Sequence, residues 1–243
     1  MKKICVFTQT YGSNRQELYK YHNNDKSDLM FRNNFENLYS FHNSPDDYYQ
    51  SIINNNYFSN LNNINMVRYN NMSYTESFKK TLNYLIENKF EYIIFLQDDC
   101  FNLSEGLYIE ELIEFINNNS FEMLNLEKTP DDLGMDNSEI FLENNKFIVY
   151  NTSSEDFKNK GLYAFDDGAY VSSIRFILEN IYDDNYFKIN DIWQSEKYLN
   201  EKIKQKRIQR LTANINFYKR VNIVGPNNWD RSNNITLLNN KFN

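Results

Sequence analysis

The stretch EYIIFLQDDCF, residues 91–101, decides the fold class. Its apolar run, residues 92–96, carries the β-branched and aromatic side chains of a strand that is covered on both faces, as in the parallel sheet of an α/β fold. Two adjacent carboxylates, Asp98 and Asp99, follow at the carboxyl end of that run. Open α/β sheets bind their ligands just beyond the carboxyl ends of the strands. The stretch therefore predicts a ligand site at the edge of a buried sheet.

Paired carboxylates in this place favour a hard divalent cation. Mg²⁺ and Mn²⁺ prefer oxygen ligands, and when the substrate is a di- or triphosphate the protein supplies only one or two carboxylates. Phosphate oxygens and water complete the shell. The pair thus predicts a metal–diphosphate site. The alternative is an acidic turn that ends a core strand, since Asp is common in turns for local hydrogen-bonding reasons.

The segment before this strand predicts a βαβ unit. Residues 64–69 have the pattern of a strand, and residues 73–88 that of a helix, because Ser73 and Glu76 have the spacing of a capping box and the apolar side chains fall on one face. Parallel strands joined by a right-handed crossover follow from this order. Nearer the N-terminus, residues 3–8 predict a first strand, residues 9–15 a polar loop and residues 37–41 a second strand.

The second half of the chain alternates between helical and extended patterns. A hairpin is predicted over residues 139–150, because two alternating halves flank the turn pair Asn144-Asn145. The helices are expected over residues 105–117, from about 173 and from about 191, and the strands over residues 123–126, 162–171 and 206–211.

Composition sets limits on the partners. The 243 residues fit one globular unit. A net charge of −7 and a pI near 5.0 argue against nucleic acid, whose binding needs an excess of Lys and Arg. An acidic, aromatic-rich surface also suits a homodimer. Asn and Tyr are abundant, as in proteins of AT-rich genomes such as those of giant viruses or low-GC bacteria.

Several other classes find no support in the residues. Cys5 and Cys100 fall in or beside core strands, which favours reduced, structural thiols. There is no P-loop, no Cys/His spacing for zinc and no long apolar segment for a signal peptide or a membrane span. The two histidines, His22 and His42, fall in a region with the pattern of a loop, which gives little support to a Ser-His-Asp hydrolase. We expect a cytoplasmic protein, in the host cytoplasm if the chain is viral.

Three stretches together resemble the GT-A nucleotide-sugar glycosyltransferases. They are VFTQTYGSNR (residues 6–15), the long segment from VRYNNMSYTESF to IIFLQDD (residues 67–99), and DDGAYVSS with NDIWQSEKYLNEK (residues 166–173 and 190–202). The resemblance implies a Rossmann-like, mostly parallel central sheet flanked by helices, with a small antiparallel hairpin. It also implies a single domain over residues 1–243, with a nucleotide-binding half at about 1–103, an acceptor-binding half at about 104–221 and a tail at 222–243.

The resemblance assigns the donor site. The motif that is D-x-D in the family reads Gln97-Asp98-Asp99 in this chain, which places Asp99 at the metal position for Mn²⁺ or Mg²⁺ and Gln97 and Asp98 near the ribose. Gln97 departs from the family, since an amide hydrogen-bonds a hydroxyl but is a poor metal ligand. The remaining candidates for contacts to the nucleotide are Thr8, Thr10, Tyr11, Arg15, Arg68 and Lys79.

The resemblance also assigns the chemistry. Asp191 matches the position of the general base that deprotonates the acceptor. It is also a good helix N-cap, which is the alternative. Asp166 and Asp167 match positions that contact the donor sugar or the acceptor, and either is an alternative base. Gly168 would allow a sugar to approach the backbone closely. The tail lacks the family's usual His, and the candidates to replace it are Asn227, Asn228, Trp229, Asp230 and Arg231.

The expected activity is metal-dependent, inverting transfer of a sugar from a nucleotide-diphosphate sugar, UDP-linked in the first instance, to a glycan or another hydroxyl acceptor. A nucleotidyltransferase of related fold is one alternative, although it would usually carry a glycine-rich loop after the first strand. A catalytically degenerate GT-A domain that binds carbohydrate or serves assembly is the other, and Gln97 and Asn190 are the residues that suggest it.

Overall fold

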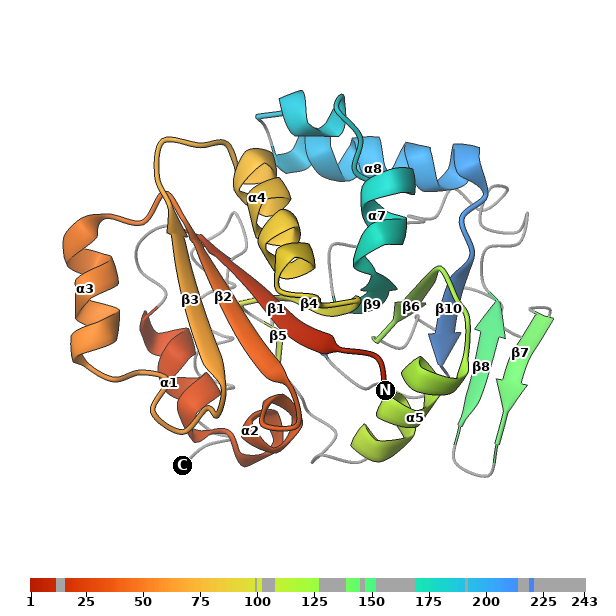
Figure 1. Ribbon diagram of the computed structural model, residues 1–243, viewed down its shortest axis with the longest axis horizontal. Helices are drawn as coiled ribbons and strands as arrows, with labels where there is room; N and C mark the ends of the chain where they lie inside the picture. Colours follow the sequence, from red (N-terminus) through yellow and green to blue (C-terminus); the bar gives the residue numbers. More distant parts are fainter. Residues whose placement is uncertain are drawn as a thin grey trace, which may run out of the picture.

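The computed structural model of the chain describes residues 1–11, 16–98, 100–101, 108–126, 139–144, 147–151, 169–190, 192–213 and 219–220. One large sheet runs through the molecule and helices cover both of its faces (Figure 1). The helices are α1 (Gln16–Asn24), α2 (Lys26–Arg32), α3 (Asp46–Asn54), α4 (Tyr74–Glu87), α5 (Ile109–Asn118), α7 (Ile174–Asn180), the short 3₁₀ helix η3 (Tyr186–Lys188) and α8 (Ile192–Lys206). The strands are β1 (Ile4–Tyr11), β2 (Glu36–His42), β3 (Ile64–Tyr69), β4 (Tyr92–Gln97), β5 (Cys100–Phe101), β6 (Met123–Asn125), β7 (Glu139–Glu143), β8 (Ile148–Asn151), β9 (Tyr170–Ser173), β10 (Arg210–Ala213) and β11 (Lys219–Arg220).

The first half of the large sheet is parallel. Its strands lie in the order β3-β2-β1-β4, and each neighbouring pair runs in the same direction. Strand β1 is central, with Cys5 opposite Glu36 of β2 and Ile4 opposite Tyr92 of β4. Their carboxyl ends meet at one edge, which is the arrangement that the sequence predicts for a ligand site.

The second half of the sheet is mixed. It continues from β4 in the order β9-β6-β10-β8-β7, and only the β6–β10 pair is parallel. The prediction of a mostly parallel sheet is therefore right for the four strands from β3 to β4 and wrong for the rest. The reason lies in β9, which enters between β4 and β6 and runs against both. Strands β5 and β11 form a separate two-stranded sheet.

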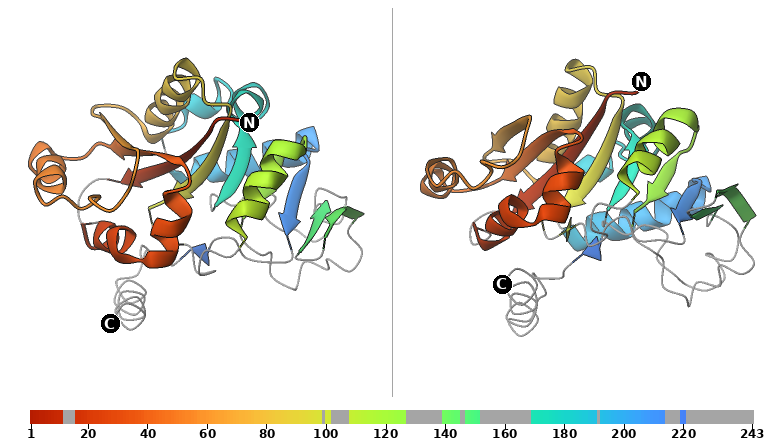
Figure 2. Two further views of the ribbon diagram at one scale, coloured as in Figure 1. Left: turned by 60° about the horizontal axis from the view of Figure 1, so that its bottom comes forward. Right: turned by 90° about the horizontal axis from the view of Figure 1, so that it is seen from below.

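Two layers of helices enclose the sheet. Helices α4, α7 and α8 lie on one face, above the sheet in Figure 1, and α1, α2 and α5 lie on the other, as the view from below in Figure 2 shows. Each face buries its own core. Phe78 and Leu82 of α4 pack with Ile177 of α7 on the first face, and Leu112 and Ile116 of α5 pack on the second.

The βαβ unit forms as the sequence predicts. Strand β3 has the predicted bounds, and α4 begins after Ser73 with a capping box: the Ser73 side chain accepts from the Glu76 N–H and the Glu76 carboxylate accepts from the Ser73 N–H. The capping box supplies acceptors to two backbone N–H groups that have no partner within the helix. The β7–β8 hairpin is also confirmed.

Two expectations near the N-terminus are wrong. Strand β1 extends to Tyr11, so Gln9 and Thr10 lie in a strand and are fully buried instead of lying in a polar loop. Helices α1 and α2 occupy part of the stretch between the first two strands, to which the sequence assigned no helix. His22 is therefore a buried helix residue, and its expected place in a loop is corrected.

Candidate active site

The carboxyl ends of β1 and β4 bring four of the predicted site residues together. Gln9 of β1 lies opposite Gln97 of β4 in the parallel register. One residue further on, Thr10 continues β1 and Asp98 begins the turn after β4. Thr8, Thr10 and Asp98 are fully buried, whereas Gln97 is partly exposed. Polar side chains at zero exposure are costly unless they find partners, so their contacts define what the site can do.

The polar end of β1 is shared between the two faces of the sheet. Successive strand residues point to opposite faces, and Gln9 turns toward α4, where its amide Nε2 donates to Ser77 Oγ at 3.3 Å. Thr8 turns toward α2, where its Oγ1 accepts from Arg32 Nη1 at 2.9 Å. Helices α4 and α2 therefore supply the polar partners that allow the polar end of β1 to be buried.

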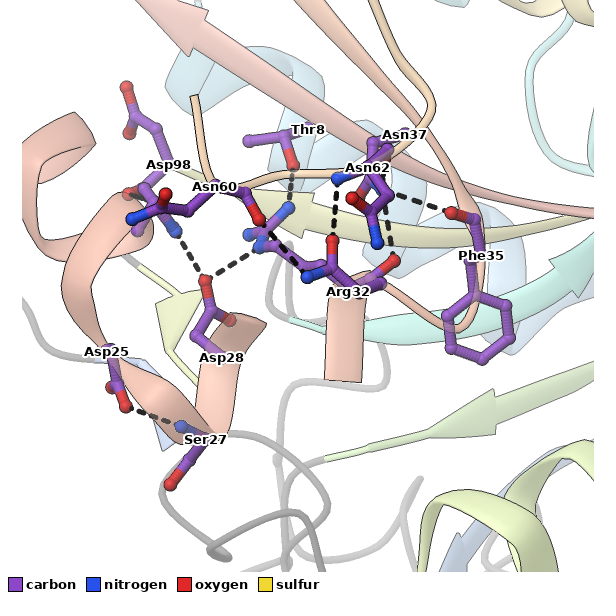
Figure 3. Close-up of polar contacts among 12 residues, drawn as sticks. Thr8, Asp25, Ser27, Asp28, Arg32, Phe35, Asn37, Asn60, Asn62 and Asp98 are labelled. Carbon is purple, nitrogen blue, oxygen red and sulfur yellow. Dashed lines mark hydrogen bonds and ion pairs between the residues drawn. The ribbon is translucent and has the colours of Figure 1, made fainter. Parts of the chain in front are cut away.

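A chain of polar contacts runs under the Asp98 turn. Arg32 Nε donates to Asp28 Oδ2 at 2.8 Å, the same oxygen lies 2.7 Å from Nδ1 of His22, and Nε2 of His22 lies 2.8 Å from the carbonyl oxygen of Asp98. The side chains of His22, Asp28 and Arg32 are completely buried. Figure 3 shows the Arg32 side chain between Thr8 and Asp28. These contacts link α1 and α2 to the ends of β1 and β4.

Buried polar atoms beside these contacts include the hydroxyls of Thr10 and Tyr19. The two hydroxyls lie close to each other, and neither makes a hydrogen bond of ordinary geometry within the described part of the chain. Burial, and after it the charge of Asp98, raises the pKa of the Tyr19 hydroxyl well above its usual range. Tyr19 thus remains a neutral phenol. A bound ligand with hydroxyl or phosphate oxygens would satisfy both atoms.

Tyr39 closes the network from β2. Burial raises the pKa of its hydroxyl above the usual range, although Arg32 acts in the opposite direction. Its ring lies edge-on to the His22 imidazole, with centroids 6.1 Å apart, and the Arg32 guanidinium lies 5.4 Å from its ring centroid. The network therefore sits in an aromatic surrounding that excludes water and strengthens its electrostatic interactions.

Arg68 and Lys79 have other partners in the structure. Arg68 on β3 donates from Nε to the Ser44 carbonyl at 2.9 Å and pairs with Asp46, which braces the entry to α3. It lies at the same sheet edge as Thr10, but β2 separates their strands. Lys79 on α4 lies 3.4 Å from Asp184 and over the ring of Phe187.

The rest of the predicted site lies outside the described residues. This holds for Arg15, Asp99, Asp166, Asp167, Gly168, Asp191 and the tail candidates Asn227, Asn228, Trp229, Asp230 and Arg231. Of Tyr11 only the backbone is described. The described residues contain no group of three or more His, Cys, Asp or Glu side chains that could hold a metal ion.

Sequence reasoning missed the support of the site, which is built from His22, Asp28 and Arg32. One signal was available: Asp28 and Arg32 stand four residues apart, the spacing of an ion pair on one helix face. Their complete burial has no counterpart in the sequence pattern, because charged residues ordinarily indicate an exposed face.

A cleft of about 490 Å³ lies between α5 and the β7–β8 hairpin. Phe115, Leu142 and Phe147 form its apolar lining, and Glu111 and Glu114 make it acidic. Two carboxylates in the lining do not favour the binding of an anionic diphosphate. The strand ends of β1 and β4 therefore remain the candidate donor site.

Several solved structures have a similar fold. S. aureus TarS has a TM-score of 0.56 at 16% sequence identity, with 97% of this chain and 39% of TarS covered. A TarS fragment, residues 1–349 in complex with UDP, has a TM-score of 0.54 at 13% identity, with 96% and 64% covered. The 4-diphosphocytidyl-2C-methyl-D-erythritol synthase from Anaerococcus prevotii has a TM-score of 0.56 at 12% identity, with 98% and 99% covered.

The chain shares their fold. It spans less than two thirds of the length of the TarS chains that it matches. No family model matches the sequence, and a comparison with curated proteins finds no match. Among the described helices, none is long and apolar enough to cross a membrane.

Proposed function

We propose that the chain is a glycosyltransferase of the GT-A type that binds a nucleotide-diphosphate sugar, UDP-linked in the first instance, beyond the carboxyl ends of β1 and β4. The observation that carries the proposal is the buried Asp98 at the end of β4, next to the unsatisfied hydroxyls of Thr10 and Tyr19. The fold supports it, because a TarS fragment with this fold was solved in complex with UDP. Ligands of open α/β sheets bind at such strand ends.

The donor contacts follow from the types of side chain. The Thr10 and Tyr19 hydroxyls offer hydrogen bonds to ribose or phosphate oxygens, and the Gln97 amide suits a ribose hydroxyl. The Thr8 hydroxyl accepts a hydrogen bond from Arg32 and so helps to hold the Arg32 side chain in place. Tyr11 and Arg15 are proposed as an aromatic face for the base and a cation for the diphosphate, with Arg68 and Lys79 as further contacts to base or phosphate.

Asp99 is proposed as the metal ligand. The residue next to it, Asp98, ends a buried strand beside the oxygen atoms of Thr10 and Tyr19, and an oxygen-rich surrounding fits Mg²⁺ or Mn²⁺. When bound, such a cation stabilises the negative charge that develops on the leaving diphosphate.

The proposed reaction is a single displacement at the anomeric carbon. Asp191 accepts the proton of the acceptor hydroxyl, whose oxygen forms a bond to the anomeric carbon. The bond from that carbon to the diphosphate oxygen breaks, and its electron pair stays on the diphosphate. The configuration at the anomeric carbon is inverted. Asp167 is the alternative base, and a glycan or another hydroxyl compound is the acceptor.

Ligand-dependent thermal stability tests the donor site. UDP, GDP, CDP and their sugars are added with and without Mn²⁺, because a ligand that binds only the folded state raises the melting temperature by mass action. We expect a Mn²⁺-dependent shift with UDP or UDP-sugars. Asp99→Ala should abolish it, and Glu87→Ala, which removes an exposed carboxylate at the C-terminal end of α4, should not. The absence of a shift with every nucleotide would contradict the proposal.

Turnover tests the base. Asp191→Asn removes the proton acceptor and keeps the size of the side chain, so binding of UDP with Mn²⁺ should stay at the wild-type level while the release of UDP from a UDP-sugar stops. Full activity of this variant would eliminate Asp191 as the base. The substitution Asp167→Asn would then test the alternative base.

A nucleotidyltransferase is the second candidate. The synthase from A. prevotii favours it, because that chain and this one cover each other almost completely. Such an enzyme would release pyrophosphate from CTP and a sugar or alcohol phosphate, whereas the glycosyltransferase would release UDP from UDP-sugar. Binding of nucleotide without either product would indicate the degenerate module that Gln97 and Asn190 suggest.

A further inference from the structure

The ring of His22 lies between two hydrogen-bonding groups. Its Nε2 lies 2.8 Å from the backbone carbonyl oxygen of Asp98. Its Nδ1 lies 2.7 Å from Oδ2 of Asp28, and that oxygen also accepts from the Arg32 guanidinium. The ring therefore bridges the Asp28–Arg32 pair and the backbone at the end of β4.

The ring lies in a buried polar cluster. The side chains of His22, Asp28, Arg32 and Asp98 are all at zero exposure. The phenols of Tyr19 and Tyr39 lie beside them, and burial keeps both neutral. A buried polar cluster is stable only when its members have hydrogen-bond partners, so the loss of one contact disturbs its neighbours.

We propose that His22 is a positioning residue of the donor site: an imidazole on α1 that bridges Asp28 and the Asp98 carbonyl and thereby holds the backbone that enters the Asp98-Asp99 pair. The proposal rests on the proposed function, because it is through this pair that the nucleotide and the metal would be bound. The position of β4 itself is set by its pairing with β1 and β9, but that pairing ends before Asp98. His22 provides the next described anchor along the chain.

Two substitutions separate the two contacts of the ring. In His22→Gln the side-chain amide reaches the position of Nε2, so the hydrogen bond to the Asp98 carbonyl is kept and the one to Asp28 is lost. In His22→Asn the shorter amide reaches the position of Nδ1, so the bond to Asp28 is kept and the one to Asp98 is lost. Both variants replace the ring by a neutral amide, and each therefore serves as the matched control of the other.

The experiment measures binding of UDP with Mn²⁺ by calorimetry, together with unfolding in urea for each variant. We expect His22→Asn to weaken binding by about 10–100-fold, the usual effect of removing a group that orients a ligand-binding residue. His22→Gln should bind at least about tenfold more tightly than His22→Asn although the two unfold at similar urea concentrations. Equal affinity in two equally stable variants would overturn the proposal.

A second measurement decides the proposal even if no nucleotide binds. In ¹⁵N-labelled protein, His22→Asn should shift the backbone amides that follow Asp98 more than His22→Gln does. Equal shifts in the two variants would overturn the assignment. Absence of nucleotide binding with the expected amide shifts would overturn the proposed function and leave the positioning role intact.

Discussion

The carboxylates of Asp28 and Asp183 each pair with a cation, yet one lies in the interior and the other at the surface. Asp28 and its partners Arg32 and His22 have no exposed side-chain surface. Asp183, in the turn before η3, keeps 38% of its side chain exposed and pairs with Lys202 of α8. Its Oδ1 also accepts from the backbone N–H of Tyr186 at 3.0 Å and from the Tyr198 hydroxyl at 2.9 Å.

The comparison shows that the same pair of charges has two different consequences. In the interior the charges have left water entirely, so each one depends on all the others for its solvation. At the surface, water can replace a lost partner, and the pair contributes little. The interior cluster therefore positions strand ends, whereas the Asp183 cluster joins η3 to α8.

The largest effect is expected from Arg32→Met. The substitution removes a guanidinium from Asp28 and Thr8 and leaves a buried carboxylate without its main partner, which should lower the free energy of unfolding by about 3–5 kcal/mol. Urea denaturation measures it. The control is Arg175→Met on the exposed side of α7, which should stay within about 0.5 kcal/mol of wild type. Similar losses at the two positions would mean that burial does not distinguish them.

A double-mutant cycle sharpens the comparison. Because Asp28→Leu and Arg32→Met each orphan the other charge, the double variant should be more stable than the sum of the single losses by about 1–3 kcal/mol. The corresponding cycle of Asp183→Leu and Lys202→Met should give a coupling of less than about 1 kcal/mol. The cycle from denaturant unfolding is the measurement, and equal couplings would contradict the distinction.

The helix cap of α4 should have an intermediate effect. Ser73→Ala removes the acceptor for the Glu76 N–H and should cost about 1 kcal/mol of unfolding free energy. Ser51→Ala, inside α3, is the control, since its hydroxyl donates to the Tyr48 carbonyl in the same helix turn and alanine is the better helix former. A loss at Ser51 as large as that at Ser73 would show that the cap contributes nothing specific.

Asp183→Asn should have the smallest effect, below about 1 kcal/mol at neutral pH. Partial burial acts to raise the pKa of Asp183, but Lys202, the Tyr186 N–H and the Tyr198 hydroxyl lower it from 3.8 to about 2. Because the folded pKa is the lower one, the stabilisation is present above pH 4 and is lost as the pH falls toward 2. The difference between wild type and variant should shrink over that range in urea unfolding, and a difference independent of pH would contradict the assignment. Asp184→Asn, at an exposed side chain, is the control.

Local patterns were predictable where one face of an element is apolar. Residues 64–69 and the α4 segment carry both periodicity and a cap, and the structure has them with almost the predicted bounds. The length of β1 was not predictable, because Gln9 and Thr10 read as a loop until the partners that bury them, such as Ser77 of α4, are known. A hydrophobic pattern cannot predict the burial of a polar side chain whose hydrogen-bond partner is distant in the sequence.

The candidate site was predictable in outline only. In the sequence, an apolar run that stops at two carboxylates predicts the end of β4. The structure places Thr8, Thr10 and Asp98 together there. His22 and Arg32 could not be assigned, because their role depends on two short helices whose apolar faces are interrupted by buried polar groups. The direction of β9 was equally hidden, since a short apolar strand reads the same whichever way its neighbours run.

The insertion of β9 and β10 also governs the order in which the chain can fold during synthesis. Strand β4 receives its second neighbour only when residues 170–173 have been made, and β6 and β8 are joined only by residues 210–213. A nascent chain on the ribosome therefore holds an open strand edge next to an already formed parallel half. Open edges pair readily with other chains, so slow translation before Ala213 would favour aggregation more than the same delay after it.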